Sequence, residues 1–476
     1  MTEAAIEALD VLIVGAGISG IDAAFHIQKR LPGKSYAILE DRERIGGTWD
    51  LFRYPGIRSD SDMYTLGFPF RPWRGDKAIV EGAEIRGYVE ATAREYGIDR
   101  RIRFGHAVTK ASWSSAEARW TVEAESAEGT RRFACAFLYL CAGYYDYAGG
   151  YRPHWPDEER FEGRIVHPQH WPEDLDHAGK NVAVIGSGAT AVTLVPALAR
   201  TAAHVTMVQR SPSYVVARPA RDALARWIGP GLTRAKNVAL SSFFFNLARK
   251  RPAKTRARLI EMAAGELPAG YDVDRHFSPG YNPWEQRLCL VPEGDLFAAI
   301  RDGKASVATG AIERFTPRGL LLGGGEEVEA DIVVTATGLV VRLMGGVALD
   351  VDGVAADPAG RLVYKGMMLE GVPNLAFAFG YTNASWTLKC DLTARYLCRL
   401  LRHMDHRGLR VATPRVAGPA VEAQPLLDFS SGYIARAAGL LPKQGQRRPW
   451  RVPQNYFRDV LTLGLGRVAD REMEFR

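Results

Sequence analysis

The sequence contains little that would suggest secretion, a membrane span or a zinc centre. Its first ten residues, MTEAAIEALD, are acidic and run straight into an apolar strand, without the basic start and apolar core of a signal peptide. No apolar run approaches the roughly 18–20 residues that cross a bilayer. The five cysteines are odd in number and none forms C-x-x-C. We therefore expect a cytoplasmic chain in a reducing compartment, with no integral membrane segment, no dithiol redox centre and no bound metal.

A strong charge excess is also absent. The net charge of +7 is small for 476 residues, and neither a domain-sized Lys/Arg block nor a nucleic-acid-binding motif occurs. We expect no nucleic-acid partner, since anionic small ligands explain a mild basic balance equally well. The length allows two or three domains with full cores, and contents of 47 % hydrophobic and 24 % charged residues are those of a globular chain. Composition predicts no oligomeric state.

Two segments repeat the pattern of an apolar strand, a glycine turn and a helix. They are VLIVGAGISG at 11–20 and VAVIGSGATA at 182–191. In each, the first glycine permits a tight turn and the second lets the backbone approach a pyrophosphate. The third small residue lets helix and strand pack closely, and the phosphates lie at the helix N-terminus. Two such units predict two dinucleotide sites, with Gly15, Gly17 and Gly20 at the first.

The residue that follows the second strand of each unit distinguishes the two nucleotides. In the first unit it is Glu40, about 20 residues beyond Gly20, where a carboxylate accepts hydrogen bonds from both ribose hydroxyls of FAD or NAD. In the second unit Arg210 and Ser211 stand there instead, and they would bind a 2′-phosphate that a carboxylate would repel. Either charge, taken alone, could be an ordinary surface charge at a strand end. Their positions relative to the glycine loops predict NADPH at the second site.

Two further apolar strands, FLYLCAG at 137–143 and IVVTATG at 332–338, end alike. Each would be the last strand of one nucleotide domain before the chain enters the other domain. The expected fold class is α/β, with two Rossmann-like dinucleotide-binding domains and a helical subdomain. We expect residues 1–147 to form the first part of an FAD-binding domain, and 338–476 its second part and a C-terminal tail. An NADP-binding domain is expected at 148–337, with a helical insertion at about 218–280.

The segment FEGRIVHPQHWP at 161–172 lies between the glycine loops and fits the pattern F-x-G-x-x-x-H-x-x-x-W-P. On this pattern the chain resembles the Baeyer–Villiger class of flavin monooxygenases. Related flavoprotein families share the glycine loops but lack this segment between them. The alternative is a surface turn in which Trp171 and Pro172 only cover a domain joint. His167 and His170 do not predict a metal site, because Pro168 disfavours a helical pair and no Cys or carboxylate completes it. We expect His167 in the hinge between domains.

Over about residues 10–460 the chain is also similar to the ethionamide-activating monooxygenase subfamily. Segments such as GGTWDLFRYPGIRSDSDMYTLG, YNPWEQRLCLVPEGDLF and FGYTNASWTLK carry this similarity. The resemblance implies an FAD enzyme that uses NADPH and O₂ to convert ketones into esters or lactones through a C4a-peroxyflavin, and that oxygenates sulfides or thioamides. The implied FAD contacts are Ser19, Glu40, Gly47, Thr48, Trp49, Asp50, Leu51, Asp60 and Val108, although Val108 could equally be an ordinary core valine. The implied NADP contacts are Arg58, Ser59, Asp60, Gly186, Ser187, Gly188, Ala189, Thr190, Ala191, Arg210 and Ser211.

The resemblance assigns the chemistry to two residues. Arg287 matches the arginine that oxygenation requires in this class, where a fixed cation would stabilise the peroxyflavin and the anionic ketone adduct. Asp60 matches an aspartate that faces the flavin and the nicotinamide and would position a neighbouring cation. Viewed alone, Arg287 could form a strand-end salt bridge, and either Asp60 or Asp62 could cap a helix that begins near Met63.

Some features depart from the family or leave alternatives open. Gln286 stands where family members often have a lysine that contacts the NADPH phosphate, and Phe52 replaces the usual asparagine of a W-x-x-N-R-Y-P-G run. A flavin-dependent reductase is disfavoured by the 161–172 segment, and its disulfide branch by the missing C-x-x-C. A flavin monooxygenase that hydroxylates nitrogen or sulfur, with little ketone activity, is the main alternative. A non-enzymatic NADPH-binding protein would not need Arg287 and Asp60.

Two later segments also carry expectations. Residues 218–265 should form helices rich in Arg and Lys, which could bind a membrane surface or calmodulin. SSFFFNLA at 241–248 instead favours an apolar side that is buried and a basic side that is solvated. GYTNASW at 380–386 follows an apolar strand and should return to the flavin, unless Thr382 or Asn383 simply caps a helix there.

Overall fold

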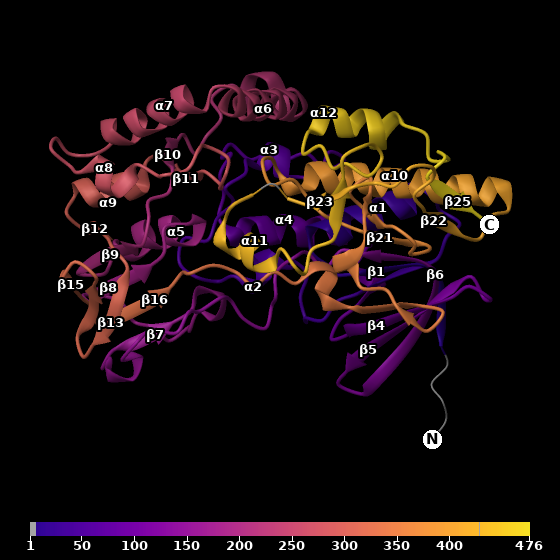
Figure 1. Ribbon diagram of the computed structural model, residues 1–476, viewed down its shortest axis with the longest axis horizontal. Helices are drawn as coiled ribbons and strands as arrows, with labels where there is room; N and C mark the ends of the chain where they lie inside the picture. The colour runs from indigo at the N-terminus through magenta and orange to yellow at the C-terminus, as the bar shows by residue number, and fades with distance from the viewer. Residues whose placement is uncertain (1–5, 428) are drawn as a thin grey trace.

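The computed structural model describes residues 6–427 and 429–476. Figure 1 shows two α/β bodies side by side, with the helices α6, α7 and α12 along one edge of the molecule. Each body is built on its own sheet, as the repeated strand–glycine–helix pattern predicts. Among the described residues, no helix combines the length and apolarity needed to cross a bilayer.

The first sheet has nine strands in the order β18-β17-β4-β5-β6-β1-β2-β3, with β21 also paired to β6. Its centre is parallel, because β1, β2, β6 and β21 run in one direction, whereas β4, β5 and β6 form an antiparallel meander. The strands are β1 (Glu7–Val14), β2 (Tyr36–Leu39), β3 (Ile102–Arg103), β4 (Ala107–Ser114), β5 (Arg119–Ser126), β6 (Gly129–Leu140), β17 (Ala348–Val351), β18 (Val354–Ala355) and β21 (Leu375–Phe377).

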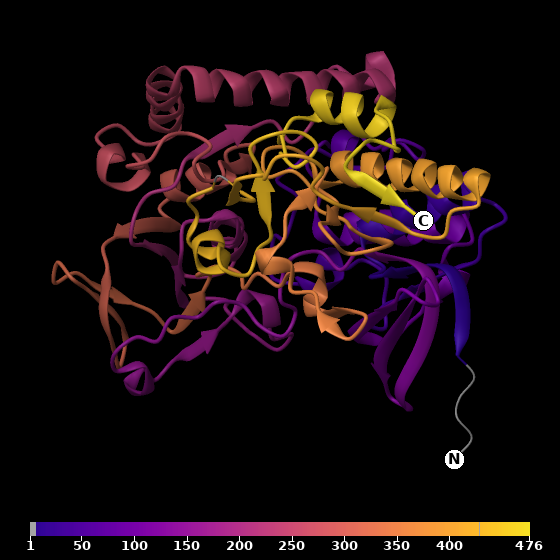
Figure 2. The ribbon, with the colours of Figure 1, turned by 45° about the vertical axis from the view of Figure 1, so that its right-hand side comes forward.

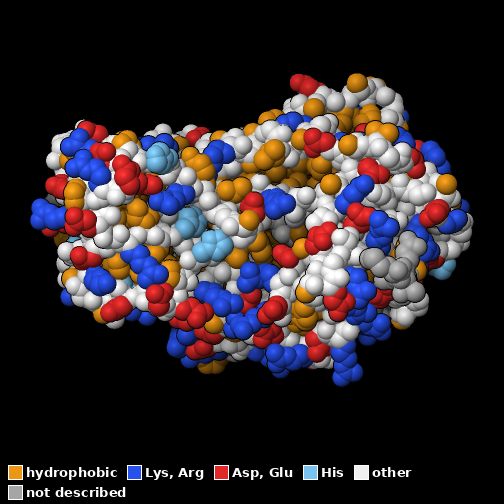
Figure 3. Space-filling view, turned by 90° about the horizontal axis from the view of Figure 1, so that it is seen from below, with side chains coloured by type: hydrophobic (Ala, Val, Ile, Leu, Met, Phe, Trp, Pro, Cys, Tyr) orange, Lys and Arg blue, Asp and Glu red, His pale blue; other side chains and the backbone are white. Residues whose placement is uncertain are grey.

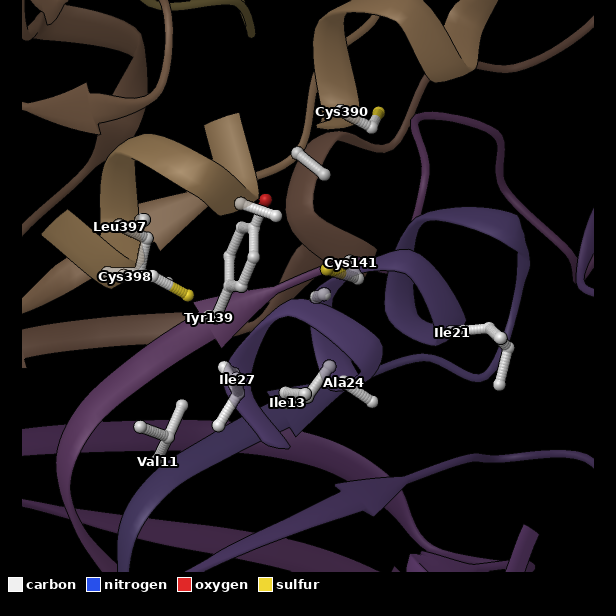
Figure 4. Close-up of a cluster of buried hydrophobic side chains, with 14 of the residues drawn as sticks. Val11, Ile13, Ile21, Ala24, Ile27, Tyr139, Cys141, Cys390, Leu397 and Cys398 are labelled. Atoms are coloured by element: carbon white, nitrogen blue, oxygen red, sulfur yellow. The ribbon is translucent and has the colours of Figure 1, made fainter. Parts of the chain in front are cut away.

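Alternating side chains of β1 fill the core on both faces of this sheet. On one face, Val11 and Ile13 pack with α1 (Ile18–Arg30), α4 (Gly82–Glu95) and α10 (Trp386–Arg407). Figure 4 shows these two side chains beside those of α1 and α10. On the other face, Leu12 pairs with the apolar cluster around Trp113 and Trp120. This two-sided burial explains why the 11–20 segment begins as a continuous apolar run.

One carboxylate in this core has no hydrogen-bond partner within residues 6–427 and 429–476. It is Asp22 in α1, and both of its oxygens are buried. His26 Nε2 lies 3.9 Å from Asp22 Oδ1 and 2.8 Å from Asp391 Oδ1. Burial, with a further contribution from the nearby Asp391 carboxylate, raises the pKa of Asp22 well above its ordinary value. The first glycine-loop helix thus carries an unsatisfied acidic group on its buried side.

The second sheet is fully parallel, with five strands in the order β12-β9-β8-β16-β7. The helices α5 (Ala189–Leu198) and α9 (Asp295–Arg301) contribute to its core. A three-stranded antiparallel sheet, β13-β14-β15, packs on the same body through Phe315 and Leu320. The strands are β7 (Arg164–Val166), β8 (Asn181–Ile185), β9 (His204–Gln209), β12 (Ala305–Thr309), β13 (Ile312–Thr316), β14 (Gly319–Leu322), β15 (Glu327–Glu329) and β16 (Ile332–Thr335).

The expected helical insertion consists of α6 (Ala225–Lys250), α7 (Pro252–Gly265) and α8 (Val273–Phe277). It connects β10 (Val215–Arg218) and β11 (Cys289–Pro292), which pair with each other. The prediction of a buried apolar side was wrong for Phe243 and Phe244, which are 60 % and 57 % exposed. Phe245 is only partly buried, so the triple-phenylalanine run does not enter the core.

The remaining elements are short. They comprise α2 (Thr48–Leu51), α3 (Met63–Leu66), β19 (Val363–Tyr364), β20 (Met368–Leu369), β22 (Ala412–Pro414), β23 (Ala423–Pro425), α11 (Gly432–Ala437), β24 (Lys443–Gly445), α12 (Tyr456–Asp459) and β25 (Met473–Phe475). Residues 460–465 continue α12 as one wider helical turn. All five cysteines are buried and unpaired.

Candidate functional site

A cavity of about 560 Å³ lies against the first glycine loop. This volume is within the roughly 300–1,000 Å³ of typical ligand and cofactor pockets. Residues far apart in the sequence meet in its walls. They include Gly15, Gly17, Ser19, Glu40, Gly46–Trp49, Ser59–Ser61, His106–Thr109, Cys141–Ala148, Arg287, Arg342, Tyr381 and Trp386.

The first glycine loop leaves space that larger residues would fill. Gly15 has φ +102°, and a β-carbon there would lie 2.7 Å from the carbonyl oxygen of Cys141. A β-carbon on Gly47 would lie 3.1 Å from the Cα of Gly17, so these two turns pack against each other in the cavity wall. At Gly20, a β-carbon would collide with the carbonyl of Gly15, where helix and strand pack. The geometry fits a pyrophosphate held by backbone amides.

Glu40 follows β2 and turns back toward this loop. Its carboxylate accepts hydrogen bonds from the amides of Ala16 (2.6 Å) and Arg42 (3.1 Å). Burial raises the pKa of Glu40, although these two amide donors oppose the shift. Val108 of β4 comes two residues after His106, whose amide donates to the Glu40 carbonyl at 2.9 Å, and it lines the cavity at a bulge in the pairing of β4 with β5. A carboxylate and an irregular backbone edge therefore face the end of the cavity beyond the glycine loop.

The GGTWDL segment divides into two parts. Thr48 and Trp49 line the cavity, whereas Asp50 and Leu51 are not among the residues of its wall. Asp50 is buried and bound by Arg42 at 2.6 Å and by Arg86 at 3.3 Å. Burial works against ionisation, but the Arg42 guanidinium and its neighbours lower the pKa of Asp50 overall. Leu51 belongs to the core of the second body. The implied cofactor contacts of Asp50 and Leu51 stay predictions.

Arg287 and Asp60 meet in the wall of the same cavity, although 227 positions separate them. Arg287 Nη1 lies 3.3 Å from Asp60 Oδ2, and about a third of each side chain is exposed (32 % and 38 %). The buried Nε of Arg287 has no hydrogen-bond partner among the described residues. Burial opposes its charge, yet Tyr144 and Asp60 raise the pKa of the guanidinium above its ordinary value. Arg287 is thus a fixed cation with an unused donor.

Asp62, and not Asp60, caps the helix that follows this segment. Asp62 is the N-cap of α3, where its Oδ1 accepts a hydrogen bond from the Thr65 amide at 3.0 Å. Asn237 of α6 also donates to Asp62, at 3.1 Å. The Asp60 carboxylate therefore remains available to Arg287.

An aromatic wall stands beside this ion pair. Tyr144 stacks on Trp386 with ring centres 5.2 Å apart, and its hydroxyl lies 2.7 Å from that of Tyr145. Trp386 Nε1 donates to Ser19 Oγ at 2.8 Å, which connects the wall to the first glycine loop. Sequence reasoning missed both tyrosines. Their place directly after the strand-closing CAG of 141–143 was the available signal, because that strand ends at the cavity.

The segment at 380–386 reaches the cavity through Tyr381, Ala384 and Trp386. Neither Thr382 nor Asn383 caps the following helix, since both bond to Gln454 instead. The N-cap position is taken by Ser385, without a side-chain cap bond. The segment thus brings a tryptophan to the first glycine loop from 367 positions further along the chain.

The second glycine loop, Gly186–Ala191, lies at the N-terminus of α5 and is not part of this cavity wall. Gly188 and Ala189 are exposed, Gly186 and Thr190 are half-buried, and Ala191 is buried. Ser187 Oγ donates to the carbonyl of Ser211 at 3.1 Å. Arg210 and Ser211 follow β9 and are exposed. Within residues 6–427 and 429–476, the guanidinium of Arg210 forms no hydrogen bond or ion pair.

The other implied NADP contacts, Arg58 and Ser59, differ in whether their side chains are already bound within the protein. Ser59 lines the cavity. Arg58 forms a two-pronged ion pair with Asp295 at the start of α9, with distances of 2.5 and 3.2 Å. Its guanidinium therefore ties the 58–60 segment to the second body. A nucleotide contact from Arg58 would have to share this pairing.

The segment that contains His167 is hydrogen-bonded to residues 146–148, where the chain leaves the first body. Gln169 donates to the carbonyl of Asp146 at 2.8 Å, and His170 Nε2 lies 3.1 Å from that of Ala148. Gly150 packs directly on the His167 ring. Burial lowers the pKa of His167, and its buried Nε2 has no hydrogen-bond partner in the part of the chain that the structure describes. A neutral imidazole thus sits at the crossing between the two bodies.

Comparison with known proteins links this architecture to flavin-dependent oxygenation. A family described as flavin-binding monooxygenase-like matches residues 62–230, and an NAD(P)-binding Rossmann-like domain matches residues 13–74. The chain is 54 % identical over 478 residues to the FAD-containing monooxygenase EthA of Mycobacterium tuberculosis (strain ATCC 25618 / H37Rv), with 98 % of each chain covered. It is 49 % identical over 481 residues to the putative FAD-containing monooxygenase MymA of the same strain, covering 98 % of this chain and 97 % of that one.

Solved structures share the fold. Cyclohexanone monooxygenase from Rhodococcus sp. Phi1 bound to NADP⁺ matches 99 % of this chain and 100 % of its own, with a TM-score of 0.76 and 20 % identity. An OTEMO complex with FAD and NADP has the same coverage, with a TM-score of 0.74 and 19 % identity. These matches confirm the predicted fold class.

Proposed function

The chain belongs to the EthA-like family of FAD-containing monooxygenases, and from this we propose that it is an NADPH-dependent oxygenase of the Baeyer–Villiger type. Its reaction would consume a ketone, O₂, NADPH and a proton, and yield an ester or lactone, water and NADP⁺. One oxygen atom enters the carbon–carbon bond beside the carbonyl, and the other leaves as water. We also propose that sulfides or thioamides are oxygenated at sulfur.

FAD is assigned to the cavity at the first glycine loop. The contact between the Gly17 and Gly47 turns in the cavity wall, and the tight turn that Gly15 and Gly20 permit, support a pyrophosphate there. Glu40 would bind the ribose and Val108 the adenine. The further assigned contacts are Ser19, Thr48, Trp49, Asp50, Leu51 and Asp60. We propose that residues 1–147 and 338–476 form the corresponding domain, whose strands lie within 7–140 and 348–377.

NADPH is assigned to the second body, at residues 148–337. The guanidinium of Arg210 is exposed and has no partner among the described residues, and with Ser211 beside it this group suits the 2′-phosphate. The pyrophosphate would lie on the exposed loop of Gly186, Ser187, Gly188, Ala189, Thr190 and Ala191 at the start of α5. Arg58, Ser59 and Asp60 are proposed to meet the nicotinamide end.

The Arg287–Asp60 pair carries the proposal. When bound, FAD supplies the redox chemistry that connects NADPH with O₂. Arg287 keeps a positive charge at the cavity wall, where its guanidinium would stabilise an oxyanion. Asp60 positions that guanidinium at 3.3 Å. The stacked rings of Tyr144 and Trp386 would exclude water from this part of the cavity, which would strengthen the attraction between the cation and a developing anion.

The proposal can be tested by measuring NADPH-driven O₂ consumption by the FAD-loaded protein with linear, cyclic and aryl ketones and with sulfides. We expect esters or lactones from ketones, sulfoxides from sulfides, and one product molecule for each NADPH. A protein that oxygenates only nitrogen or sulfur, with no ester from any ketone, would belong to the alternative class of hydroxylating flavin monooxygenases. NADPH oxidation that yields only hydrogen peroxide with every substrate would contradict both assignments.

A further inference from the structure

An exposed apolar surface runs along α6 and the helical turns at 456–465. We define it as the outer helical surface: Trp227, Leu232, Leu240, Phe243, Phe244, Phe457, Leu461 and Leu465. These are eight of the fifteen large apolar side chains that are exposed in the described part of the chain, and their exposure reaches 75 % for Trp227 and Leu465. Single exposed apolar side chains are ordinary, whereas a gathered set marks an interaction site.

The two helical segments present these side chains from one edge of the molecule. Figures 1 and 2 both show α6 and α12 along the same edge, and residues of both segments line one small hollow between them. Phe457, Leu461 and Leu465 are spaced by four, so they project from one side of their helix. Leu232, Leu240 and Phe243 do the same on α6, at spacings of eight and three.

The positive charge of the chain is concentrated at this surface. Residues 225–265 contain nine Lys and Arg and a single acidic residue, Glu261, which is a net charge of +8. Since the whole chain has +7, the other residues together carry −1. Helix α6 itself has no Asp or Glu. On the opposite side, Figure 3 shows Lys and Arg mixed with Asp and Glu.

Part of this charge is free to bind a partner. Arg234 is occupied by three backbone carbonyls of residues 64–67, which fix α6 to the body beneath, and Lys236 is occupied by Asp222 in the segment just before α6. Lys250, Arg251 and Lys254, at the junction of α6 and α7, are exposed. In the described ranges their side chains form no hydrogen bond or ion pair.

We propose that the outer helical surface docks the protein on an anionic lipid bilayer, with its Phe, Trp and Leu side chains in the headgroup region and Lys250, Arg251 and Lys254 against lipid phosphates. Interfacial helices combine an apolar face with basic flanks in this way. A second copy is disfavoured as the occupant, because a twofold dimer sets the same patch against itself and would oppose two surfaces of net charge +8. The inference does not depend on the proposed substrates.

Flotation of the FAD-loaded protein with lipid vesicles tests the proposal. We expect binding to vesicles of phosphatidylcholine mixed with phosphatidylglycerol, and much weaker binding to phosphatidylcholine alone. Lys250→Ala with Lys254→Ala should weaken binding roughly thirtyfold, since each basic side chain near such a surface accounts for about a fivefold change. Phe243→Ser with Leu461→Ser should weaken it by more than roughly tenfold.

Matched controls remove similar groups elsewhere. Arg100→Ala with Lys304→Ala lowers the net charge by the same amount, and Val354→Ser removes an exposed apolar side chain of β18. Both controls should bind vesicles as the unmodified protein does, and all variants should keep their flavin. Equal binding to both kinds of vesicle, no binding to either, or equal losses in variants and controls would overturn the proposal. So would a dimer in solution that Phe243→Ser with Leu461→Ser abolishes while vesicle binding stays absent.

Discussion

Replacing Arg287 by alanine should separate the oxidation of NADPH from the oxygenation of substrate. The structure fixes this guanidinium by one 3.3 Å ion pair to Asp60, and its buried Nε–H has no partner among the residues that the structure describes. An anion about 4 Å from such a charge gains about 4 kcal/mol at an effective dielectric constant of about 20. Loss of one preorganised oxyanion donor typically costs about 2.7–4 kcal/mol, or 10²- to 10³-fold in rate. The electrostatic gain and the typical mutational loss are therefore of the same size.

We therefore expect Arg287→Ala to keep its flavin and to oxidise NADPH, while ester formation from a ketone falls about 10²- to 10³-fold. The electrons of NADPH should then appear as hydrogen peroxide. The assay measures NADPH, O₂, peroxide and ester in one reaction. Arg287→Lys keeps the charge but loses the fork and the Nε–H, so it should lose roughly tenfold.

A matched control is Arg342→Ala, which removes another guanidinium from the same cavity wall. Arg342 pairs with Asp146 at 3.6 Å and has no contact with Asp60. We expect a smaller effect on ester formation than in Arg287→Ala. Normal ester yield from Arg287→Ala would refute the assigned role, and so would a variant that cannot retain FAD.

Three other perturbations probe the rest of the chain. Arg210→Ala should raise KM for NADPH by about ten- to a hundredfold and leave KM for NADH nearly unchanged, and equal use of both coenzymes by the unmodified protein would contradict the assignment. Gly17→Val should yield colourless protein, because its side chain enters the space facing Gly47; full flavin content would show that FAD binds elsewhere. Asp22→Asn should raise Tm more at about pH 8 than at about pH 5. The folded state holds the Asp22 proton more tightly than the unfolded chain does, so unmodified stability falls with rising pH by at most about 1.4 kcal/mol per pH unit. A Tm difference that shrinks with rising pH would disprove the unpaired-carboxylate argument.

Local features of the sequence were enough to predict the two nucleotide folds. A tight turn at Gly15, close packing at Gly20 and a buried parallel strand are each encoded within about ten residues, so 11–20 and 182–191 predict their own structure. The difference between Glu40 and Arg210 is likewise visible in the sequence, because each position is fixed by distance from its own loop. Arg287 and Asp60 were predicted only from the family resemblance. They lie 227 positions apart, so no local sequence pattern indicates that they meet.

Only the tertiary structure decided which polar groups are free and which apolar groups are covered. The SDSD run offers two equivalent carboxylates, and the register of α3 gives the cap to Asp62 and leaves Asp60 for Arg287. Asp50 and Arg58, implied to contact cofactors, have their charges engaged by Arg42 and Asp295. The run of Phe243 to Phe245 predicted burial, yet α6 turns Phe243 and Phe244 outward because Arg234 and Asn237 fasten the opposite side. Sequence periodicity defines the faces of a helix, but the long-range contacts of the folded chain determine which face meets the core.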